Sequence, residues 1–320
     1  MYTHSCGHKA VGVNFAPMPQ DTRQSLHAPR HWPSWIAIGL LRLLVLLPWP
    51  LLMTAGEGIG RLIKLFSARR VKIADINLQM CYPQMSSAER KRLIGENFAA
   101  MGKGLMEIGM GWWWSHERVE KRLLGIEGEE NLPPQDGRGT IFLTAHFSTL
   151  ELSGRYLGHR CPSYAMYRPN ENPVIQAMLE RHRARMILGV IARNDVRAMI
   201  RALKAGEGVW FAPDQNYARK GKVFADFMGV PAATHTATSR FAKTTNARVV
   251  PFVLIREEHG YRLRIEPELQ DFPSSDVQHD TQRINDLYAQ WVEQAPEQYN
   301  WIHRRFKTRP DQAPSPYEGL

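Results

Sequence analysis

The sequence predicts a single α/β domain with a central mixed sheet flanked by helices and an apolar helix in front of it. Short apolar runs at 141–145, 209–212 and 249–255 have the composition of buried strands, and helical segments separate them. A turn at 257–260 leads into alternating apolar residues, which is typical of a hairpin. Strands that alternate with helices along one chain indicate an α/β fold.

The N-terminal part of the chain has a different pattern. We expect 1–30 to form a flexible tail, because it is polar, rich in Gly, Pro and His and without any period. The segment 31–56 is the most apolar of the chain, and its only charge is Arg42. About 20 apolar residues just suffice to cross a bilayer, so we expect a membrane-anchor helix here. Pro48 and Pro50 would weaken or kink it, and a buried core helix is the alternative.

The remaining boundaries follow from charge and period. More basic residues follow the apolar segment than precede it, a bias that places the rest of the chain on the cytoplasmic side of a membrane. We expect 57–137 to be helical and close to the membrane, with one helix beginning at Ser86, where Glu89 completes a capping-box spacing. The α/β core is then expected at 138–312 and a C-terminal tail at 313–320.

The composition indicates an anionic partner. The chain has 41 Lys and Arg against 31 Asp and Glu, a net charge of +10. Nucleic acid, anionic lipid or an acidic protein would each suit this charge. The basic residues are not interleaved with base-stacking aromatic residues, so we expect no nucleic acid. The 3 cysteines are widely spaced and lack a CxxC motif, so a disulfide framework is not indicated.

The candidate catalytic pair is His146 and Glu151. His146 follows an apolar run that should end a strand, and Glu151 falls in the first turn of a helix that Ser148 or Thr149 could cap. A carboxylate at this spacing can fold back onto one imidazole nitrogen and leave the other free to take a proton. One such pair is also expected by chance among 12 histidines, so an ordinary histidine at a strand end is the alternative.

Several other chemistries are disfavoured. The chain has no GxSxG elbow, no Walker A loop, no GxGxxG after a strand and no HExxH motif. His146 and Glu151 lack a third ligand at metal-binding spacing, so we expect no metal, and no cofactor is predicted. Three further polar and basic clusters follow: 167–173 with Arg168, continuing to Arg183 and its neighbours at 181–185; 212–222 with Asp214; and 301–309. A solvated face is the alternative for each, but together they suit phosphate groups at strand ends.

Four blocks of the sequence resemble one enzyme family. They are TAHFSTLELSGR (144–155), YRPNENP (167–173), IRALKAGEGVWFAPDQNYARKGKVF (200–224) and APEQYNWIHRRFKTRP (295–310). In this order they closely resemble the late acyltransferases of lipid A biosynthesis, most nearly the lauroyl or palmitoleoyl type. The resemblance runs from about residue 26 to residue 317. At 214–218 the chain has Asp-Gln-Asn-Tyr-Ala, where relatives often have Asp-His-Asp-Tyr-Gly or Asp-Gln-Asp-Tyr-Gly.

The resemblance implies a membrane-anchored enzyme on the cytoplasmic face of a Gram-negative inner membrane. Such an enzyme moves a lauroyl-like chain from acyl carrier protein onto a hydroxyl of a hydroxyacyl chain on a phosphorylated lipid A precursor of the (Kdo)2-lipid IVA type. His146 matches the family's catalytic base, and Glu151 its partner. Arg168, Arg183 and Asp214 match further shared blocks, and we expect them to bind substrate.

Two other functions stay open at this point. A glycerol-phospholipid acyltransferase of the lysophosphatidate type uses the same His-x4-acid logic, although it typically has Asp in place of Glu151. A non-catalytic membrane protein that binds anionic lipid would also account for the positive charge.

Overall fold

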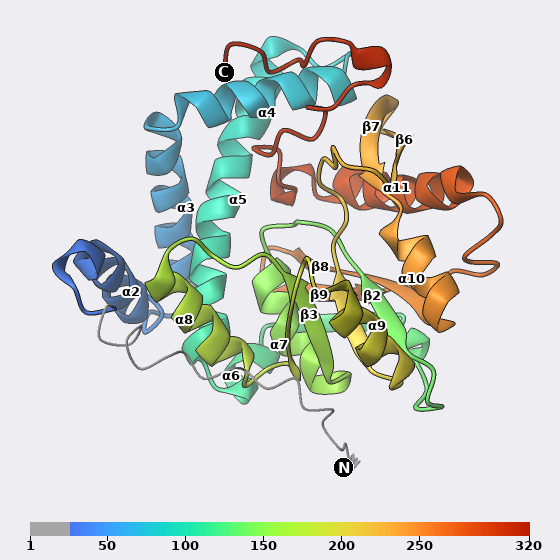
Figure 1. Cartoon of the computed structure of the whole chain (residues 1–320). Coiled ribbons are helices and arrows are strands. Elements are labelled where there is room, and N and C mark those ends of the chain that lie inside the picture. Colours follow the sequence, from blue (N-terminus) through green and yellow to red (C-terminus); the bar gives the residue numbers. More distant parts are fainter. Residues whose placement is uncertain (1–25) are drawn as a thin grey trace.

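The structure of the protein is a computed structural model that describes residues 26–320 (Figure 1). Its centre is a seven-stranded sheet with the strand order β1-β9-β8-β2-β5-β3-β4. Neighbouring strands are parallel except β8 and β9, so the sheet is mixed, as predicted. The strands are β1 Leu123–Glu127, β2 Thr140–Leu143, β3 Ser163–Tyr167, β4 Gly189–Ala192, β5 Gly208–Phe211, β8 Arg248–Arg256 and β9 Tyr261–Ile265.

Helices cover both faces of the sheet. Side chains alternate between the two faces along each strand, and both faces carry apolar side chains that must be buried. On β2, Ile141 and Leu143 join the core beneath α9, α10 and α11, whereas Phe142 joins the core beneath α7. The parallel strands β2, β3, β4 and β5 therefore form a middle layer and end at one shared edge. The helices of this part are α7 Leu150–Arg160, α8 Pro173–Arg183, α9 Val196–Lys204, α10 Ala237–Thr245 and α11 Val277–Gln294.

A long helix, α5 (Ser87–Trp113), stands between the sheet and the N-terminal helices (Figure 1). It begins at the predicted capping box. The Ser86 hydroxyl accepts a hydrogen bond from the Glu89 N–H, and the Glu89 carboxylate accepts one from the Ser86 N–H. The prediction of this helix start from two residues is thus confirmed.

The helix α3 (Trp49–Leu65) lies directly against α5, and their backbones touch at glycines (Figure 1). A Cβ atom on Gly102 would lie 2.0 Å from the Gly56 carbonyl oxygen. A Cβ atom on Gly60 would lie 2.0 Å from the Phe98 carbonyl oxygen. No side chain fits at either position, so the close contact of the two helices depends on these glycines.

The segment 31–56, expected as one membrane-anchor helix, is divided between two helices. α2 (Trp32–Leu44) ends before Pro48, and α3 begins at Trp49 with Pro50 in its first turn. A proline there loses no helical hydrogen bond, because the first N–H groups of a helix have no partner within it. Among residues 26–320, no helix is both long and apolar enough to cross a membrane. The predicted anchor is therefore not confirmed.

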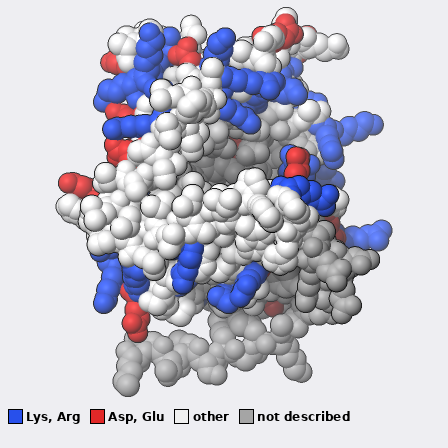
Figure 2. Space-filling view, turned by 90° about the vertical axis from the view of Figure 1, so that its left-hand side faces the viewer, with Lys and Arg blue, Asp and Glu red and all other residues white. Residues whose placement is uncertain are grey.

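Large apolar side chains remain on the outside of α2 and α3. Leu65 is 75% exposed and Phe66 is 84% exposed. Figure 2 shows this side of the molecule: uncharged residues form a broad band, Lys and Arg lie above and below it, and the surface is hollowed above the band. The exposed residues, which we call the α2–α3 apolar face, are Trp32, Ile36, Leu40, Leu43, Leu46, Leu51, Leu62, Ile63, Leu65 and Phe66. Contiguous apolar patches of this kind mark interaction sites.

The segment 57–137 is helical as far as α6 (His116–Glu120) and includes α4 (Ala68–Cys81). It then supplies strand β1, which pairs with β9, so the sheet extends beyond the predicted core at 138–312. The tail at 313–320 is packed through Tyr317, whose hydroxyl accepts from the Phe306 N–H at 3.0 Å. Of the tail expected at 1–30, residues 1–25 lie outside the described part of the chain.

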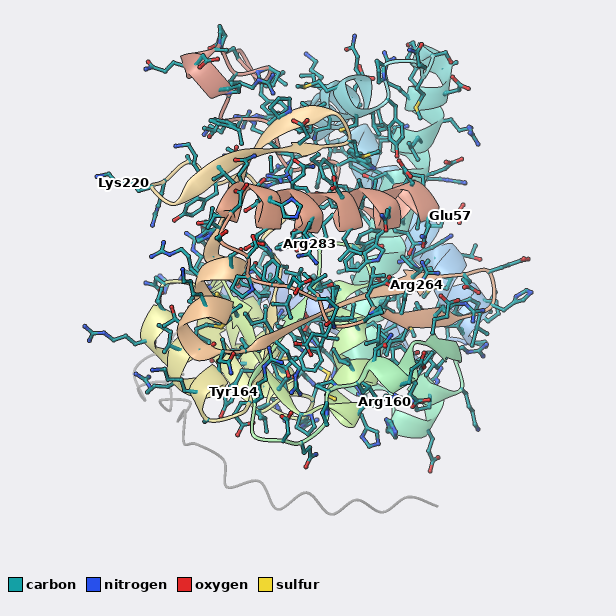
Figure 3. The ribbon with its side chains drawn as sticks, turned by 90° about the vertical axis from the view of Figure 1, so that its right-hand side faces the viewer. Glu57, Arg160, Tyr164, Lys220, Arg264 and Arg283 are labelled. Atoms are coloured by element: carbon teal, nitrogen blue, oxygen red, sulfur yellow. The ribbon has the colours of Figure 1, made fainter. Side chains whose placement is uncertain are left out.

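The predicted hairpin is present as β8 and β9, which pair from Phe252 with Ile265 to Arg256 with Tyr261. The sequence interpretation named neither β3 nor β4, and it also missed a second sheet. This sheet consists of β6 (Lys222–Phe227) and β7 (Val230–His235), and it lies over α11 (Figure 3). The side chain of Asn285 on α11 donates to the Ala225 carbonyl at 3.2 Å and ties the two together.

Candidate active site

The segment 144–149 connects β2 to α7 and carries His146. A second segment, 298–300, fixes its backbone. The Ser148 N–H donates to the Gln298 carbonyl at 2.8 Å, and the Asn300 N–H donates to the His146 carbonyl at 3.1 Å. His146 thus lies on a connection that is held at the edge where the parallel strands end, which is where ligands usually bind in α/β sheets.

The imidazole of His146 is held by Asp214, which follows the end of β5. Asp214 Oδ1 lies 2.5 Å from His146 Nδ1, and Asp214 Oδ2 accepts a hydrogen bond from the His146 backbone N–H at 3.0 Å. The Asp214 carboxylate is buried, whereas the His146 side chain is 33% exposed. One carboxylate therefore fixes both the main chain and the ring of His146, and the Nε2 edge of the ring remains for a reacting group.

The two partners stabilise each other's charged form. Burial disfavours the imidazolium, but the charge of Asp214 and its hydrogen bond outweigh burial and raise the pKa of His146 above its ordinary value. Burial also disfavours the carboxylate, yet the charge and hydrogen bonds of His146 hold the pKa of Asp214 below its ordinary value, with help from buried Arg305. An ionised Asp214 favours the tautomer of His146 that carries its proton on Nδ1.

Glu151 does not make the contact with His146 that the sequence analysis expected. Its carboxylate forms a two-pronged ion pair with Arg183, in which Nε lies 3.0 Å from Oε1 and Nη2 lies 2.6 Å from Oε2. Burial opposes the charge of Arg183, but the charge and hydrogen bonds of Glu151 raise the pKa of this guanidinium. The guanidinium fork matches both carboxylate oxygens at once, which explains why Glu151 pairs with α8.

Of the predicted site residues, the structure thus forms two pairs, His146 with Asp214 and Glu151 with Arg183. Arg168 belongs to neither pair. Its side chain is 62% exposed, and it forms an ion pair with Glu171 at 2.8 Å. Arg168 follows β3, so it lies at the same edge of the sheet but on the outer surface.

An apolar cavity of about 570 Å³ opens beside these two pairs of side chains. His146 and Glu151 both line it, and its walls come from α3, α5, the segment 146–151 and the segment 298–302. The apolar wall residues include Ile63, Phe98, Met101, Leu105, Ile108 and Ile302. Its volume falls within the range of about 300–1,000 Å³ that is typical of small-molecule sites. An apolar chain in this cavity would end next to the imidazole.

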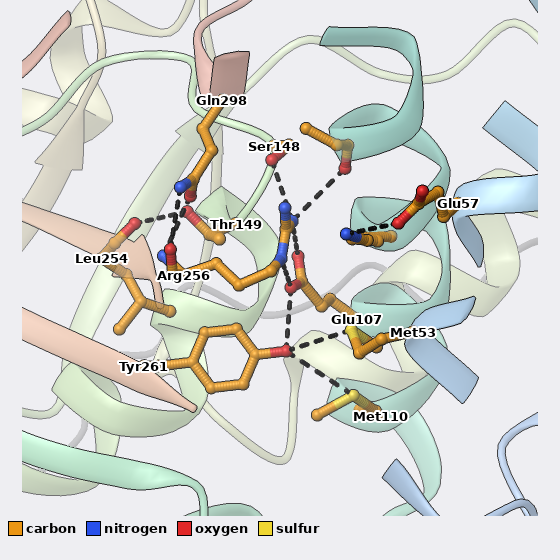
Figure 4. A network of polar contacts seen from close by, with 12 residues as sticks. Met53, Glu57, Glu107, Met110, Ser148, Thr149, Leu254, Arg256, Tyr261 and Gln298 are labelled. Atoms are coloured by element: carbon orange, nitrogen blue, oxygen red, sulfur yellow. Dashed lines mark hydrogen bonds and ion pairs between the residues drawn. The ribbon is translucent and has the colours of Figure 1, made fainter. Parts of the chain in front are cut away.

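A buried ion pair supports the segment 144–149 from below (Figure 4). The Arg256 guanidinium, at the end of β8, lies 2.5 Å and 2.8 Å from the two carboxylate oxygens of Glu107 on α5. Arg256 Nη2 also donates to the Ser148 hydroxyl at 3.0 Å, and the Tyr261 hydroxyl donates to Glu107 at 2.8 Å. The Gln298 side chain bonds both the N–H and the carbonyl of Arg256, each at 2.9 Å. This network joins α5, the sheet and both segments of the site.

Sequence reasoning missed the contact between Asp214 and His146 and the pair of Glu107 and Arg256. Asp214 was visible as an acid after a strand end, in the same kind of position as His146, and that shared position was the available signal. Glu107 lies on an otherwise apolar face of α5, and an isolated acid there indicates a buried partner. Nothing in the sequence indicated that this partner is Arg256.

The chain is similar to known proteins over most of its length. The family model described as bacterial lipid A biosynthesis acyltransferase matches residues 20–308. The lipid A biosynthesis palmitoleoyltransferase of Escherichia coli (strain K12) is 41% identical over 299 residues, which cover 92% of this chain and 97% of the relative. The lipid A biosynthesis lauroyltransferase of the same strain is 40% identical over 305 residues, which cover 94% and 99%.

A solved structure, the 1-acyl-sn-glycerophosphate (LPA) acyltransferase from Thermotoga maritima, covers 81% of this chain and 97% of its own. Its TM-score to this chain is 0.38 and its sequence identity is 17%. The chain belongs to the bacterial lipid A biosynthesis acyltransferase family, and it is an acyltransferase.

Proposed function

We propose that the protein transfers a lauroyl-like chain from acyl carrier protein to a hydroxyacyl chain of a phosphorylated lipid A precursor of the (Kdo)2-lipid IVA type. The observation that carries the proposal is an imidazole, oriented by a buried carboxylate, at an apolar cavity of about 570 Å³. The names of the two relatives, a palmitoleoyltransferase and a lauroyltransferase, support a fatty acyl chain as the group transferred.

His146 acts as the general base. The acceptor is an alcohol, which is a poor nucleophile at neutral pH, whereas a thioester is an activated acyl donor. With its proton on Nδ1, His146 accepts the hydroxyl proton at Nε2 while the alcohol oxygen attacks the thioester carbonyl. The tetrahedral intermediate then expels the thiolate, and the imidazolium returns the proton to the sulfur. General-base assistance of this kind is worth about 10²- to 10⁴-fold in rate.

Asp214 stabilises the imidazolium that forms at this step. Its charge lies 2.5 Å from Nδ1, and the same charge raises the pKa of His146. A raised pKa makes the imidazole a stronger base, although a smaller fraction of it is neutral at a given pH. In this mechanism Asp214 takes the role that the sequence analysis assigned to Glu151.

The N-terminus of α7 stabilises the negative charge on the carbonyl oxygen. This helix begins at Leu150, four residues after His146, and no side chain caps it. The Leu150 N–H donates to the Phe147 carbonyl, but the next N–H groups, those of Glu151 and Leu152, and the helix dipole favour a negative charge close to the imidazole. Glu151 lies in this first turn, and its ion pair with Arg183 holds the turn against α8. We assign Glu151 and Arg183 the role of positioning these N–H groups.

The apolar cavity holds the acyl chain. Gly60, Gly102 and Gly104 line it together with larger apolar side chains, so the chain passes close to the backbones of α3 and α5. Each buried methylene contributes about 0.8 kcal/mol, so the length of the cavity selects among donors. Arg168, on the outer surface at the same edge, is available to the phosphate groups of the precursor.

The α2–α3 apolar face attaches the enzyme to the cytoplasmic face of the inner membrane. Its side chains are exposed along both helices, and Lys and Arg border it in Figure 2. An apolar face with basic borders suits a helix pair that lies in the interface of an anionic membrane. The acceptor is itself a lipid, so in this arrangement it can reach the cavity while it remains in the membrane.

The proposal is tested with purified protein, acyl carrier protein loaded with a labelled lauroyl chain, and either the lipid A precursor or lysophosphatidate as acceptor. We expect one lauroyl chain to be added to the precursor, seen as a mass increase, and no transfer to lysophosphatidate. His146→Ala should lose transfer while keeping its thermal unfolding midpoint. Transfer to lysophosphatidate alone, or wild-type turnover in His146→Ala, would overturn the proposal.

A further inference from the structure

The excess positive charge of the chain is concentrated in one region. Residues 181–243, about a fifth of the sequence, contain 12 of the 41 Lys and Arg but only 4 of the 31 Asp and Glu. Two of these four acids, Glu207 and Asp214, are buried, and a third, Asp195, caps α9 by accepting from the Ala198 N–H. Little negative charge therefore remains on the surface of this region.

The basic side chains of this region form a surface over α9, α10 and the loop before β6. We call it the α9–α10 basic surface; its members are exposed, and within residues 26–320 none forms an ion pair with a carboxylate: Arg193, Arg197, Arg201, Lys204, Arg219, Lys220, Arg240 and Lys243. In contrast, the cations on β8 and β9 are paired: Arg256 with Glu107, Arg262 with Glu257, and Arg264 with Glu127.

The members of this surface lie close to one another. α9 and α10 stand side by side (Figure 1) and share one core. The loop before β6 touches α10, since a Cβ atom on Gly221 would lie 3.2 Å from Arg240 Nη1. Lys220, on this loop, points away from the body of the molecule (Figure 3). The eight cations thus present one continuous positive field to solvent.

This surface adjoins the active site along the edge of the sheet. Arg193 follows β4 and its N–H donates to the Tyr167 carbonyl at the end of β3. Arg219 comes five residues after Asp214, the residue that holds His146. In the strand order β2-β5-β3-β4, His146 follows β2, Asp214 follows β5 and Arg193 follows β4. The active site and the basic surface therefore lie along the same edge of the sheet.

The position of the surface decides between the two kinds of anionic partner. Figure 1 shows α2 and α3 on one side of the molecule and α9 and α10 on the other. A membrane that contacts the α2–α3 apolar face leaves the α9–α10 basic surface open to solvent. A soluble acidic protein can reach it there, whereas the phosphates of a lipid held in that membrane would lie on the opposite side.

We propose that the α9–α10 basic surface docks the acidic carrier protein that delivers the acyl thioester. The inference rests on the proposed function, because it takes the carrier protein as the donor. The carrier holds its thioester at the end of a flexible arm, so docking beside the site lets the thioester reach His146. Docking of this kind depends on charge complementarity, which accelerates association by about 10- to 10³-fold and weakens with salt.

Two charge-reversal variants test the proposal. Arg197→Glu/Arg201→Glu reverses two exposed cations on one face of α9, and Glu at the first of these positions suits the N-terminal turn of a helix. Lys91→Glu/Lys121→Glu is the matched control, since both lysines are exposed, unpaired within residues 26–320 and outside the basic surface. The two variants change the net charge equally. Each is assayed with saturating lipid A precursor and a varied donor, either loaded acyl carrier protein or an uncharged acyl-pantetheine thioester, and then with varied precursor at a fixed concentration of acyl-pantetheine.

We expect the α9 variant to raise the KM for the loaded carrier protein by about 10-fold, at the low end of the range for steered association. Its KM for acyl-pantetheine and for the precursor should stay at the wild-type value, as should every constant of the control. Added salt should weaken carrier use by the wild type more than by the α9 variant, which keeps six of the eight cations.

An unchanged KM for the carrier protein, or an equal loss with both donors, would overturn the docking proposal. A raised KM for the precursor would show that the surface binds lipid phosphate instead. Absence of any transfer from the carrier by the wild type would contradict the proposed function itself, which separates the two failures.

Discussion

Separate replacement of Asp214 and Glu151 decides which carboxylate orients His146. Asp214→Asn keeps the size of the side chain but removes the charge that lies 2.5 Å from Nδ1. The new amide can also turn its NH2 group towards Nδ1, which moves the imidazole proton to Nε2, the wrong tautomer for a base. Neutralising the acid behind the catalytic histidine of a serine protease costs about 10⁴-fold in kcat, and we expect a loss of about 10²- to 10⁴-fold here.

Glu151→Gln should have a smaller effect. The amide oxygen still accepts a hydrogen bond from Arg183, so the variant loses one charge-assisted bond of a two-pronged pair. If this change weakens the hold on the first turn of α7 by about 1.4 kcal/mol in the transition state, the rate falls about tenfold. The contact between Asp214 and His146 is untouched by this substitution.

The pH dependence of kcat/KM separates the two roles more sharply than the rates do. The base must be neutral, so the rate rises with pH through the pKa of His146. This rise is the acidic limb of the profile, and the raised pKa of His146 puts it above pH ~6.5 in the wild type. Asp214→Asn removes the charge that raises this pKa and leaves burial, which lowers it, so the limb should move to lower pH. Glu151→Gln should leave the limb in place.

The assay is the initial rate of acyl transfer between about pH 5 and 9, with thermal unfolding as the control for folding. The reasoning is wrong if Glu151→Gln moves the acidic limb and Asp214→Asn does not. That result would restore the role that the sequence alone assigned to Glu151.

Three further changes test the scaffold and the cavity. Gly102→Ala should destabilise the fold by about 1–3 kcal/mol in chemical denaturation, because its methyl group meets the backbone of α3; Gly58→Ala, which meets nothing within 4 Å, should not. Arg256→Met should cost about 3–5 kcal/mol by leaving Glu107 buried and unpaired, and adding Glu107→Met should recover most of this loss. Met101→Trp narrows the cavity, so competition between donors should shift towards shorter chains by about fourfold per excluded methylene; unchanged selectivity would place the chain elsewhere.

The elements that the sequence predicted well are those with a local signal. The start of α5 was predicted from the capping-box spacing of Ser86 and Glu89. Strands β2, β5 and β8 were visible as apolar runs because they are buried on both faces. Strand β3 begins with Ser163 and contains two tyrosines, so it lacked such a run, whereas β4 lies in the apolar stretch 186–192, which the sequence interpretation overlooked.

The structure pairs the candidate residues differently from the contact expected from the sequence. His146, Glu151, Arg183 and Asp214 were all named, yet the expected bond joined two residues five apart in sequence. The structure instead pairs His146 with Asp214, 68 residues away, and Glu151 with Arg183, 32 residues away. Which strand ends lie next to each other depends on the order β2-β5-β3, and strand order is not encoded in any local pattern.

The glycine contact between α3 and α5 limits where the cavity can change its shape. Where Gly60 and Gly102 meet the facing helix, the wall of the cavity is main chain, which a substitution can only push apart. The shape of the cavity can therefore be changed only through the side chains around this contact, such as Met101 and Leu105. A single substitution at one of these side chains would reshape the cavity, while the backbone contact, and with it the packing of α3 on α5, would stay in place.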